Sequence, residues 1–260
     1  KAIQTTLAKD KENNDMSLYD WYAKALSDNK QILQRITNVL VADSAFSKKP
    51  FIDNILGIGF NVVSRLRHDA ALYYLWEGDP TGKPGRPRVK GEKIDFKNID
   101  KSKVAILDTD ESNGQVYALK AWCKSLHRKI SLVIHILPKG GHRLYFSTDE
   151  SMSGRDVMEY YCTRFQIEFC FRDAKQFVGL TDSQARDTRK LDFAFNSSFT
   201  AVNVAKIMCS EYNLSIWRLK ALIINAYYAQ RIIDVFENNP NTQLNPEIVN
   251  EIFGFAADAA

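Results

Sequence analysis

One segment of the sequence places charged and phenolic side chains at helical spacing. Tyr161, Arg164, Glu168, Arg172 and Lys175 follow one another at intervals of three or four residues. At about 100° per residue, they fall within an arc of roughly 80° on one face of a helix. A partly buried carboxylate flanked by guanidinium groups is a candidate functional site, and carboxylates are the ligands that hard divalent cations prefer. The spacing therefore predicts a polar stripe with a carboxylate at its centre.

A purely structural interpretation of the same stripe stays open. Arg164, Glu168 and Arg172 stand four residues apart in turn, where ion pairs on an exposed helix contribute about 0.2–0.5 kcal/mol each. Four phenylalanines in the same segment favour the functional interpretation, because they leave little of the helix free to be a plain solvated surface. A second arc, which includes Ile167 and Phe171, is apolar and is expected to be buried.

A second carboxylate follows a short apolar run. Residues 38–42 predict a buried strand that ends just before Asp43. Residues 47–56 predict a helix and residues 60–66 a second strand. A strand, a helix and a strand with short links form a parallel pair with a right-handed crossover. Asp43 is therefore expected at the carboxyl edge of the sheet, where open α/β folds place their sites.

The remaining elements frame these two carboxylates. A helical rhythm over residues 17–36 precedes the Asp43 strand, and residues 76–93 form a loop rich in Gly, Pro and basic residues. That loop is either a solvated connection or a strip that meets DNA phosphates. A mostly antiparallel β region follows, with strands at 104–107, 115–119, 130–137 and 144–147. Helices are expected at 153–177, 191–211, 217–237 and 246–255.

Composition narrows the class of protein. The chain has 260 residues, of which 45% are hydrophobic and 25% charged, so it can bury a sizeable core. A net charge of +4 permits nucleic acid as a partner without requiring it. No stretch approaches the roughly 20 apolar residues that span a bilayer, so we expect a cytoplasmic protein without membrane contact. The four cysteines show no CxxC pair and are interpreted as reduced thiols.

Other polar and aromatic residues carry weaker signals. The four histidines are scattered without zinc-ligand spacing. Asp69 is interpreted as a turn carboxylate and Trp122 as a packing residue. Their functional alternatives are a third acidic neighbour of the site and an aromatic that contacts a base. The Gly82–Arg88 segment lacks the ending of a phosphate-binding loop, so no nucleotide triphosphate site is expected.

The stripe also carries a family signature. Tyr161, two residues, Arg164, three residues, Glu168, six residues and Lys175 match without a gap the Tyr-Arg-Glu-Lys pattern of DDE transposases in bacterial insertion sequences. The chain resembles the insertion-sequence-four group of that family, in its C-terminal part. Residues 41–47 resemble the strand of the family's second aspartate, and residues 63–67 resemble the next strand. The resemblance extends from about Leu40 to Phe255.

This resemblance implies a fold and a division of the chain. The fold is α/β, with an RNase H-like catalytic core that is incomplete at its N-terminus, a β-rich insertion and a helical C-terminal region. Residues 1–67 are expected to form the first part of the core and residues 68–150 the insertion. Residues 151–260 are expected to supply the helical part of the core, including Glu168.

The resemblance also implies a reaction and its residues. Asp43 and Glu168 are expected to be catalytic and to hold two Mg²⁺ or Mn²⁺ ions for DNA cleavage and strand transfer at insertion-sequence ends. Tyr161, Arg164 and Lys175 are expected to bind DNA phosphates, and we add Arg172 because it lies on the same arc. The partner is double-stranded DNA, bound by a homodimer, in a bacterial protein that associates with the nucleoid when it is bound to DNA.

The chain departs from the family pattern at the first aspartate, for which it has no matching residue. Asp10, Asp15 and Asp20 follow no apolar strand pattern, so one metal ligand and the first strands of the sheet are expected to be missing. Lys1 and the polar residues after it suggest a chain entered in the middle of a longer protein. We therefore expect no transposition by this chain alone. The alternatives are a non-catalytic DNA-binding remnant of a transposase, or an interaction protein whose charged helix is only salt-bridged.

Overall fold

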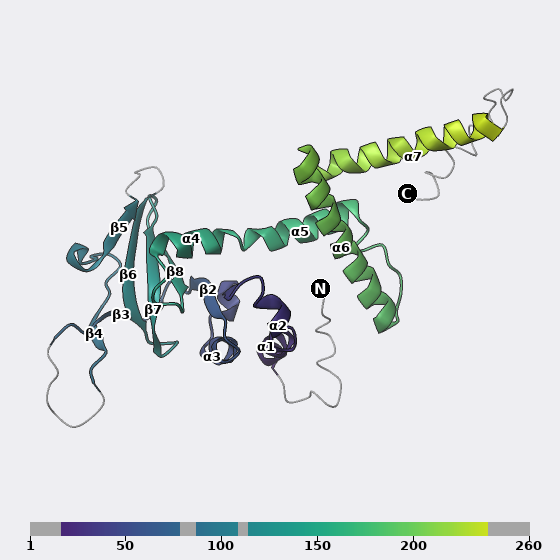
Figure 1. Ribbon diagram of the computed structural model, residues 1–260. Coiled ribbons are helices and arrows are strands. Elements are labelled where there is room, and N and C mark those ends of the chain that lie inside the picture. Colours follow the sequence, from purple (N-terminus) through teal and green to yellow (C-terminus); the bar gives the residue numbers. More distant parts are fainter. Residues whose placement is uncertain (1–16, 79–86, 109–113, 239–260) are drawn as a thin grey trace. The chain divides into compact units, whose positions relative to one another are not determined.

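The structure of the chain is a computed structural model that describes residues 17–78, 87–108 and 114–238. These residues form two compact units, one ending at Ile167 and the other beginning at Glu168. The first unit is built on an eight-stranded sheet with the order β1-β2-β8-β7-β6-β3-β4, in which β5 pairs with β6 (Figure 1). The predicted mixed α/β class is confirmed.

The elements of the first unit follow the chain closely. Its strands are β1 (Val39–Val41), β2 (Asn61–Leu66), β3 (Leu72–Leu75), β4 (Lys90–Lys93), β5 (Ala105–Asp108), β6 (Gln115–Cys123), β7 (Arg128–Ile136) and β8 (His142–Ser147). Its helices are α1 (Leu18–Asp28), α2 (Lys30–Leu33), α3 (Lys49–Gly57) and α4 (Gly154–Cys162), with short 3₁₀ helices η3 (Ser44–Phe46) and η4 (Lys101–Lys103). β1 and β2 are parallel, as predicted, and the other strand pairs of the sheet are antiparallel.

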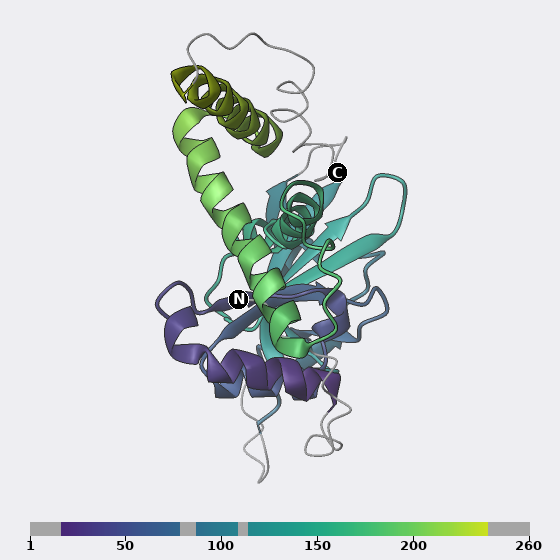
Figure 2. The same cartoon turned by 90° about the vertical axis from the view of Figure 1, so that its right-hand side faces the viewer.

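Strand alternation divides the core into two layers. Successive side chains of a strand point to opposite faces, so Val62 and Val63 of β2 belong to different hydrophobic clusters. The Val62 cluster includes Ile52 and Ile55 of α3 and Ala23 of α1. The Val63 cluster packs against α4 instead. Figure 2 accordingly shows α1 and α3 on one side of the sheet and α4 on the other.

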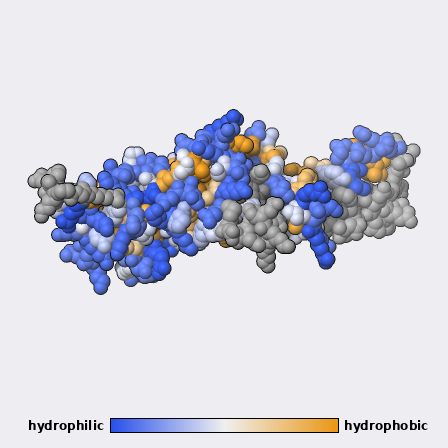
Figure 3. Space-filling view, turned by 90° about the horizontal axis from the view of Figure 1, so that it is seen from below, coloured by the Kyte–Doolittle hydropathy of each residue, from blue (hydrophilic) through white to orange (hydrophobic). Residues whose placement is uncertain are grey.

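The second unit is helical. It contains α5 (Phe165–Phe177) from Glu168 onward, α6 (Thr188–Tyr212) and α7 (Ile216–Asn238). Ala174, Leu180 and Val202 form its small buried core. Large apolar side chains are exposed on all three helices. On the face of the chain drawn in Figure 3, hydrophobic residues form small patches within a mostly hydrophilic surface.

The structure corrects three expectations about elements. β3 was not predicted, and β4 occupies the end of a segment predicted to be a loop. β4 reads Lys-Gly-Glu-Lys and is the last strand on its side of the sheet, where charged residues are typical because they discourage further strand pairing. The helix predicted over residues 153–177 is interrupted between α4 and α5. The helix predicted over 246–255 lies outside the described residues.

Within residues 17–78, 87–108 and 114–238, no helix combines the length and apolarity needed to cross a bilayer.

Candidate functional site

Asp43 lies where the strand pattern predicts. It follows β1 by two residues and caps η3, with its Oδ1 atom accepting a hydrogen bond of 2.7 Å from the Ser44 backbone N–H. Its side chain is exposed, and Oδ2 accepts no hydrogen bond from the described residues. The carboxylate therefore has an oxygen available for a cation, and hard divalent cations prefer oxygen ligands of this kind.

Two serines fix the backbone around Asp43. Ser64 of β2 is fully buried, and its hydroxyl donates to the Asp43 carbonyl at 3.1 Å. Ser47 lies 2.9 Å from the Ser64 hydroxyl and donates to the Arg65 carbonyl at 2.8 Å. Buried polar groups are costly unless they are paired, so this network ties the turn after β1 firmly to β2. Neither serine was predicted, and only Ser64 carries a signal in the sequence, as a polar residue inside an apolar strand.

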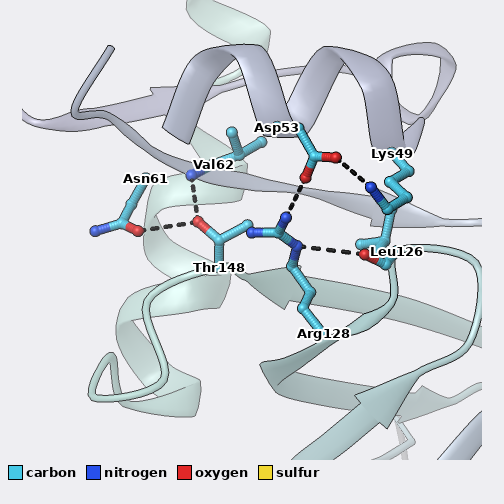
Figure 4. Close-up of polar contacts among 7 residues, drawn as sticks. All are labelled: Lys49, Asp53, Asn61, Val62, Leu126, Arg128 and Thr148. Atoms are coloured by element: carbon cyan, nitrogen blue, oxygen red, sulfur yellow. Dashed lines mark hydrogen bonds and ion pairs between the residues drawn. The ribbon is translucent and has the colours of Figure 1, made fainter. Parts of the chain in front are cut away.

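Contacts further from the site hold α3 and β2 in place against the rest of the sheet (Figure 4). Arg128 of β7 and Lys49 of α3 both donate to the carboxylate of Asp53 on α3. Thr148, just after β8, accepts a hydrogen bond from the Val62 backbone N–H at 2.8 Å and donates to Asn61 at 3.0 Å. These contacts anchor the helix and strand that flank Asp43 to the rest of the sheet.

Tyr161 of α4 lies close to Asp43 although the two residues are far apart in sequence. Its side chain is buried, and its ring centroid is 4.9 Å from that of Tyr145 on β8. Burial raises the pKa of the Tyr161 phenol above its ordinary value of 10.0, while the guanidinium groups of Arg164 and Arg65 act in the opposite direction. Asp43 and Tyr145 add to the increase in this pKa. One electrostatic neighbourhood thus contains a carboxylate, a protonated phenol and two guanidinium groups.

The chain turns more tightly between α4 and α5 than the predicted helix would. The Arg164 N–H bonds to the Tyr161 carbonyl at 3.1 Å, and the Gln166 N–H bonds to the Thr163 carbonyl at 2.9 Å. Such bonds between residues three apart are those of a 3₁₀ turn, which advances about 120° per residue. The prediction that all five residues share one helical arc is therefore wrong across this turn.

Arg164 lies within this turn and is partly buried. Its guanidinium carbon is 4.4 Å from the ring centroid of Phe165 and 5.9 Å from that of Tyr161. Contacts of this kind hold a guanidinium plane against an aromatic face. The turn thus places Arg164 beside Tyr161 through ring contacts.

Glu168, Arg172 and Lys175 lie on α5 in the second unit, and all three are exposed. The expectation that Glu168 is partly buried is therefore wrong. The apolar arc is also less buried than predicted, because Ile167 is 60% and Phe171 42% exposed. The helix was expected to rest on a continuous apolar face, but the described part of the chain covers only some of that face.

A buried acid on the same helix was not predicted. Asp173 is 6% exposed, and its carboxylate is 3.1 Å from Arg172 and 3.8 Å from Lys206 of α6. Arg172 therefore already has a partner within the helical unit. Nothing in the spacing distinguished Asp173, because it stands outside the polar stripe.

The remaining polar candidates behave as ordinary residues. Asp69 pairs with Arg67 at 3.1 Å, and all four cysteines are free thiols. In the part of the chain that the structure describes, no cluster of three or more His, Cys, Asp and Glu side chains is arranged to hold a metal ion. The donor chemistry of Asp43, an exposed carboxylate with an available oxygen, fits a divalent cation.

Most of the chain matches one family of known proteins. Residues 23–204 match the family model described as "Transposase DDE domain". A search of curated proteins finds no match. The matched range includes Asp43 and all five residues of the polar stripe.

Proposed function

The chain belongs to the family of transposase DDE domains, and from this premise we propose that it is a transposase of the insertion-sequence-four group. Transposases act on DNA, and this family uses divalent metal ions. The proposed reaction is cleavage of DNA at insertion-sequence ends followed by strand transfer. The observation that carries the proposal is the neighbourhood of Asp43, Arg65, Tyr161 and Arg164, which the fold assembles from distant parts of the chain.

Asp43 and Glu168 are the proposed metal ligands. Both side chains are exposed carboxylates, and Asp43 follows the carboxyl end of a strand in the parallel pair. The parallel pair of β1 and β2, joined through α3, supports an RNase H-like arrangement. When bound, two Mg²⁺ or Mn²⁺ ions would activate the attacking oxygen and stabilise the leaving oxygen of a phosphodiester.

The phenol and the cationic side chains of the stripe have separate proposed roles in binding DNA. The Tyr161 phenol, whose ordinary pKa of 10.0 is raised further by burial, is protonated at neutral pH and can donate a hydrogen bond to a phosphate oxygen. Arg164 can bind a phosphate with two parallel hydrogen bonds, whereas Lys175 acts as a point charge. Arg172 is proposed as a weaker phosphate contact because Asp173 already pairs with it.

The sheet has a free position next to Asp43. β1 is the last strand of the sheet, and its outer edge pairs with no strand among the described residues. An edge strand presents unpaired backbone N–H and C=O groups that a further strand can use. We propose that a strand carrying one more carboxylate pairs at this edge in the active assembly, a homodimer on paired DNA ends.

A non-catalytic DNA-binding protein is the second candidate. The unit that contains Asp43 gathers that carboxylate and two guanidinium groups around the Tyr161 phenol. This set suits phosphate binding even without cleavage. Divalent metal binding at Asp43 separates the two candidates, since only the enzyme requires it.

The proposal is tested by measuring affinity for duplex DNA and for metal in the same preparations. We expect the logarithm of the DNA association constant to fall linearly with the logarithm of salt concentration. Arg164→Ala should weaken binding about tenfold or more, whereas Arg67→Ala, at an exposed arginine paired with Asp69, should change it less than about twofold.

Metal binding is measured by titrating Mn²⁺ into the DNA complex. We expect Asp43→Asn to remove at least one bound Mn²⁺ and the control Asp69→Asn to remove none. DNA binding without any Mn²⁺ site at Asp43 would favour the second candidate. Absence of salt-dependent DNA binding would contradict both.

A further inference from the structure

A row of four side chains crosses the sheet on the side away from β1. Tyr73 of β3 is directly opposite Lys93 of β4 on one side and Trp122 of β6 on the other. Trp122 is in turn opposite Lys129 of β7. Directly opposed residues in an antiparallel sheet point to the same face. The row therefore places two adjacent aromatic side chains between two lysines, and we call it the Lys93–Lys129 row.

Two further lysines extend this row. Lys120 is two residues before Trp122 on β6, so it shares the same face. Lys90 of β4 lies over the ring of Tyr73, with its Nζ atom 5.7 Å from the ring centroid. Both aromatic rings are half-buried, and all four lysines are exposed. The platform thus has aromatic surface at its centre and ammonium groups around it.

Few acidic side chains accompany these lysines in the part of the chain that the structure describes. Glu92 is the single acidic residue in β3, β4, β6 and β7. Lys90, Lys93, Lys120 and Lys129 form no ion pair with the described residues, whereas Arg128 of β7 is paired with Asp53. Four lysines around aromatic rings, without an acidic partner among the described residues, suit an anionic ligand better than packing within the chain.

The platform shares a sheet face with the proposed site. Ala118, four residues before Trp122 on β6, belongs to the cluster that packs against Val157 and Tyr161 of α4. β1 and β6 are separated by three intervening strands in the sheet order. At about 4.8 Å per strand interval, the platform lies about 19 Å across the sheet from the strand that precedes Asp43.

We propose that this platform binds unpaired single-stranded DNA, with bases stacked on Trp122 and Tyr73 and phosphates next to the lysines. Aromatic surface surrounded by cations is the arrangement that suits single strands, because every base offers a face for stacking. In duplex DNA the bases are stacked on one another, so the duplex could contact this platform only through its phosphates and the lysines. The proposal rests on DNA being the substrate, and it adds a second contact region on the same face of the sheet.

The test uses a labelled thymidine oligonucleotide, EDTA to exclude divalent metal, and fluorescence anisotropy. We expect Lys93→Glu/Lys129→Glu to weaken binding at least about tenfold. The matched control, Lys97→Glu/Lys139→Glu, changes the charge equally at two exposed lysines outside the row and should weaken binding less than about threefold. Trp122→Leu should weaken binding about fivefold or more, and Trp122→Phe should retain most of it.

Circular dichroism and thermal melting accompany each variant, so that misfolding is recognised. Equal losses in the two double variants, or no difference between Trp122→Leu and Trp122→Phe, would overturn the proposal. So would a loss of duplex binding as large as the loss of single-strand binding. Because the assay contains no divalent metal, its outcome is independent of Asp43, and failure here leaves the metal site to be judged separately.

Discussion

Tyr161 illustrates how the fold sets the properties of a single side chain. Its phenol is buried next to Tyr145, and burial is the largest cause of its raised pKa, while two nearby guanidinium groups act in the opposite direction. A neutral hydroxyl in this position can donate a hydrogen bond to an anion. Arg164, which contacts Phe165, can supply a positive charge for the same anion. At the scale of residues, the site is therefore suited to a phosphate.

Replacing Tyr161 by Phe tests the direction of this pKa shift. A raised pKa in the folded state means that the contribution to stability is complete below pH 10.0 and is lost as the pH rises through the folded-state value. We expect the wild-type free energy of unfolding to fall more steeply than that of Tyr161→Phe between about pH 9 and about pH 11. Urea unfolding at several pH values measures both curves. A steeper fall in the variant would show that the shift has the opposite sign.

Elements are positioned by a few close contacts. Gly154, at the start of α4, approaches β6 so closely that a Cβ atom there would lie 2.4 Å from the Cβ of Ala118 and 2.8 Å from Leu107. α3 is held to β7 through Asp53 and Arg128. The first contact sets how close α4, and with it Tyr161, lies to the sheet. The second secures the helix that follows Asp43.

Gly154→Ala is expected to destabilise the protein. The added methyl group would force α4 away from β6, at a cost of about 1–3 kcal/mol in the free energy of unfolding. Gly57→Ala is the control, because nothing lies within 4 Å of its Cβ position at the end of α3. That variant should be neutral or more stable by up to about 1 kcal/mol. Chemical denaturation measures both, and similar effects of the two substitutions would contradict the close approach.

Arg128→Ala and Lys49→Ala separate a partly buried contact from an exposed one. Both side chains donate to Asp53, but that of Arg128 is 25% exposed and that of Lys49 is 45% exposed. We expect a loss of about 1–3 kcal/mol for Arg128→Ala and of less than about 0.5 kcal/mol for Lys49→Ala. Thermal unfolding compares the two. A larger loss for Lys49→Ala would mean that α3 is held mainly by its own surface charge pair.

The sequence predicted the elements around the site better than their details. The apolar run before Asp43 and the strand at 60–66 identified the parallel pair, because a buried strand requires continuous hydrophobicity. The break at Thr163 and Arg164 could not be predicted, since neither residue disrupts a helix by itself. Ser47 and Ser64 were also missed, because their value depends on a partner across the sheet. β4 escaped notice because a charged edge strand resembles a loop.

At the scale of the whole molecule, one sheet carries both proposed DNA contact regions. Asp43 lies beyond β1 at one side of the sheet, and the Lys93–Lys129 row crosses β4, β3, β6 and β7 at the other. Glu168 belongs to the helical unit, whose helices expose large apolar side chains. If the proposed reaction is correct, this unit must bring Glu168 to the metal ions that Asp43 is proposed to bind.

Iron-directed cleavage of the protein backbone tests this central requirement most directly. Fe²⁺ replaces Mg²⁺ in the DNA complex, and ascorbate with peroxide produces hydroxyl radicals that cut the chain near the bound ion. We expect cuts close to both Asp43 and Glu168, suppressed by excess Mg²⁺, and we expect Asp43→Asn to abolish both sets of cuts. Cuts near Glu168 that persist in Asp43→Asn, or cuts near only one of the two residues, would contradict a shared metal site.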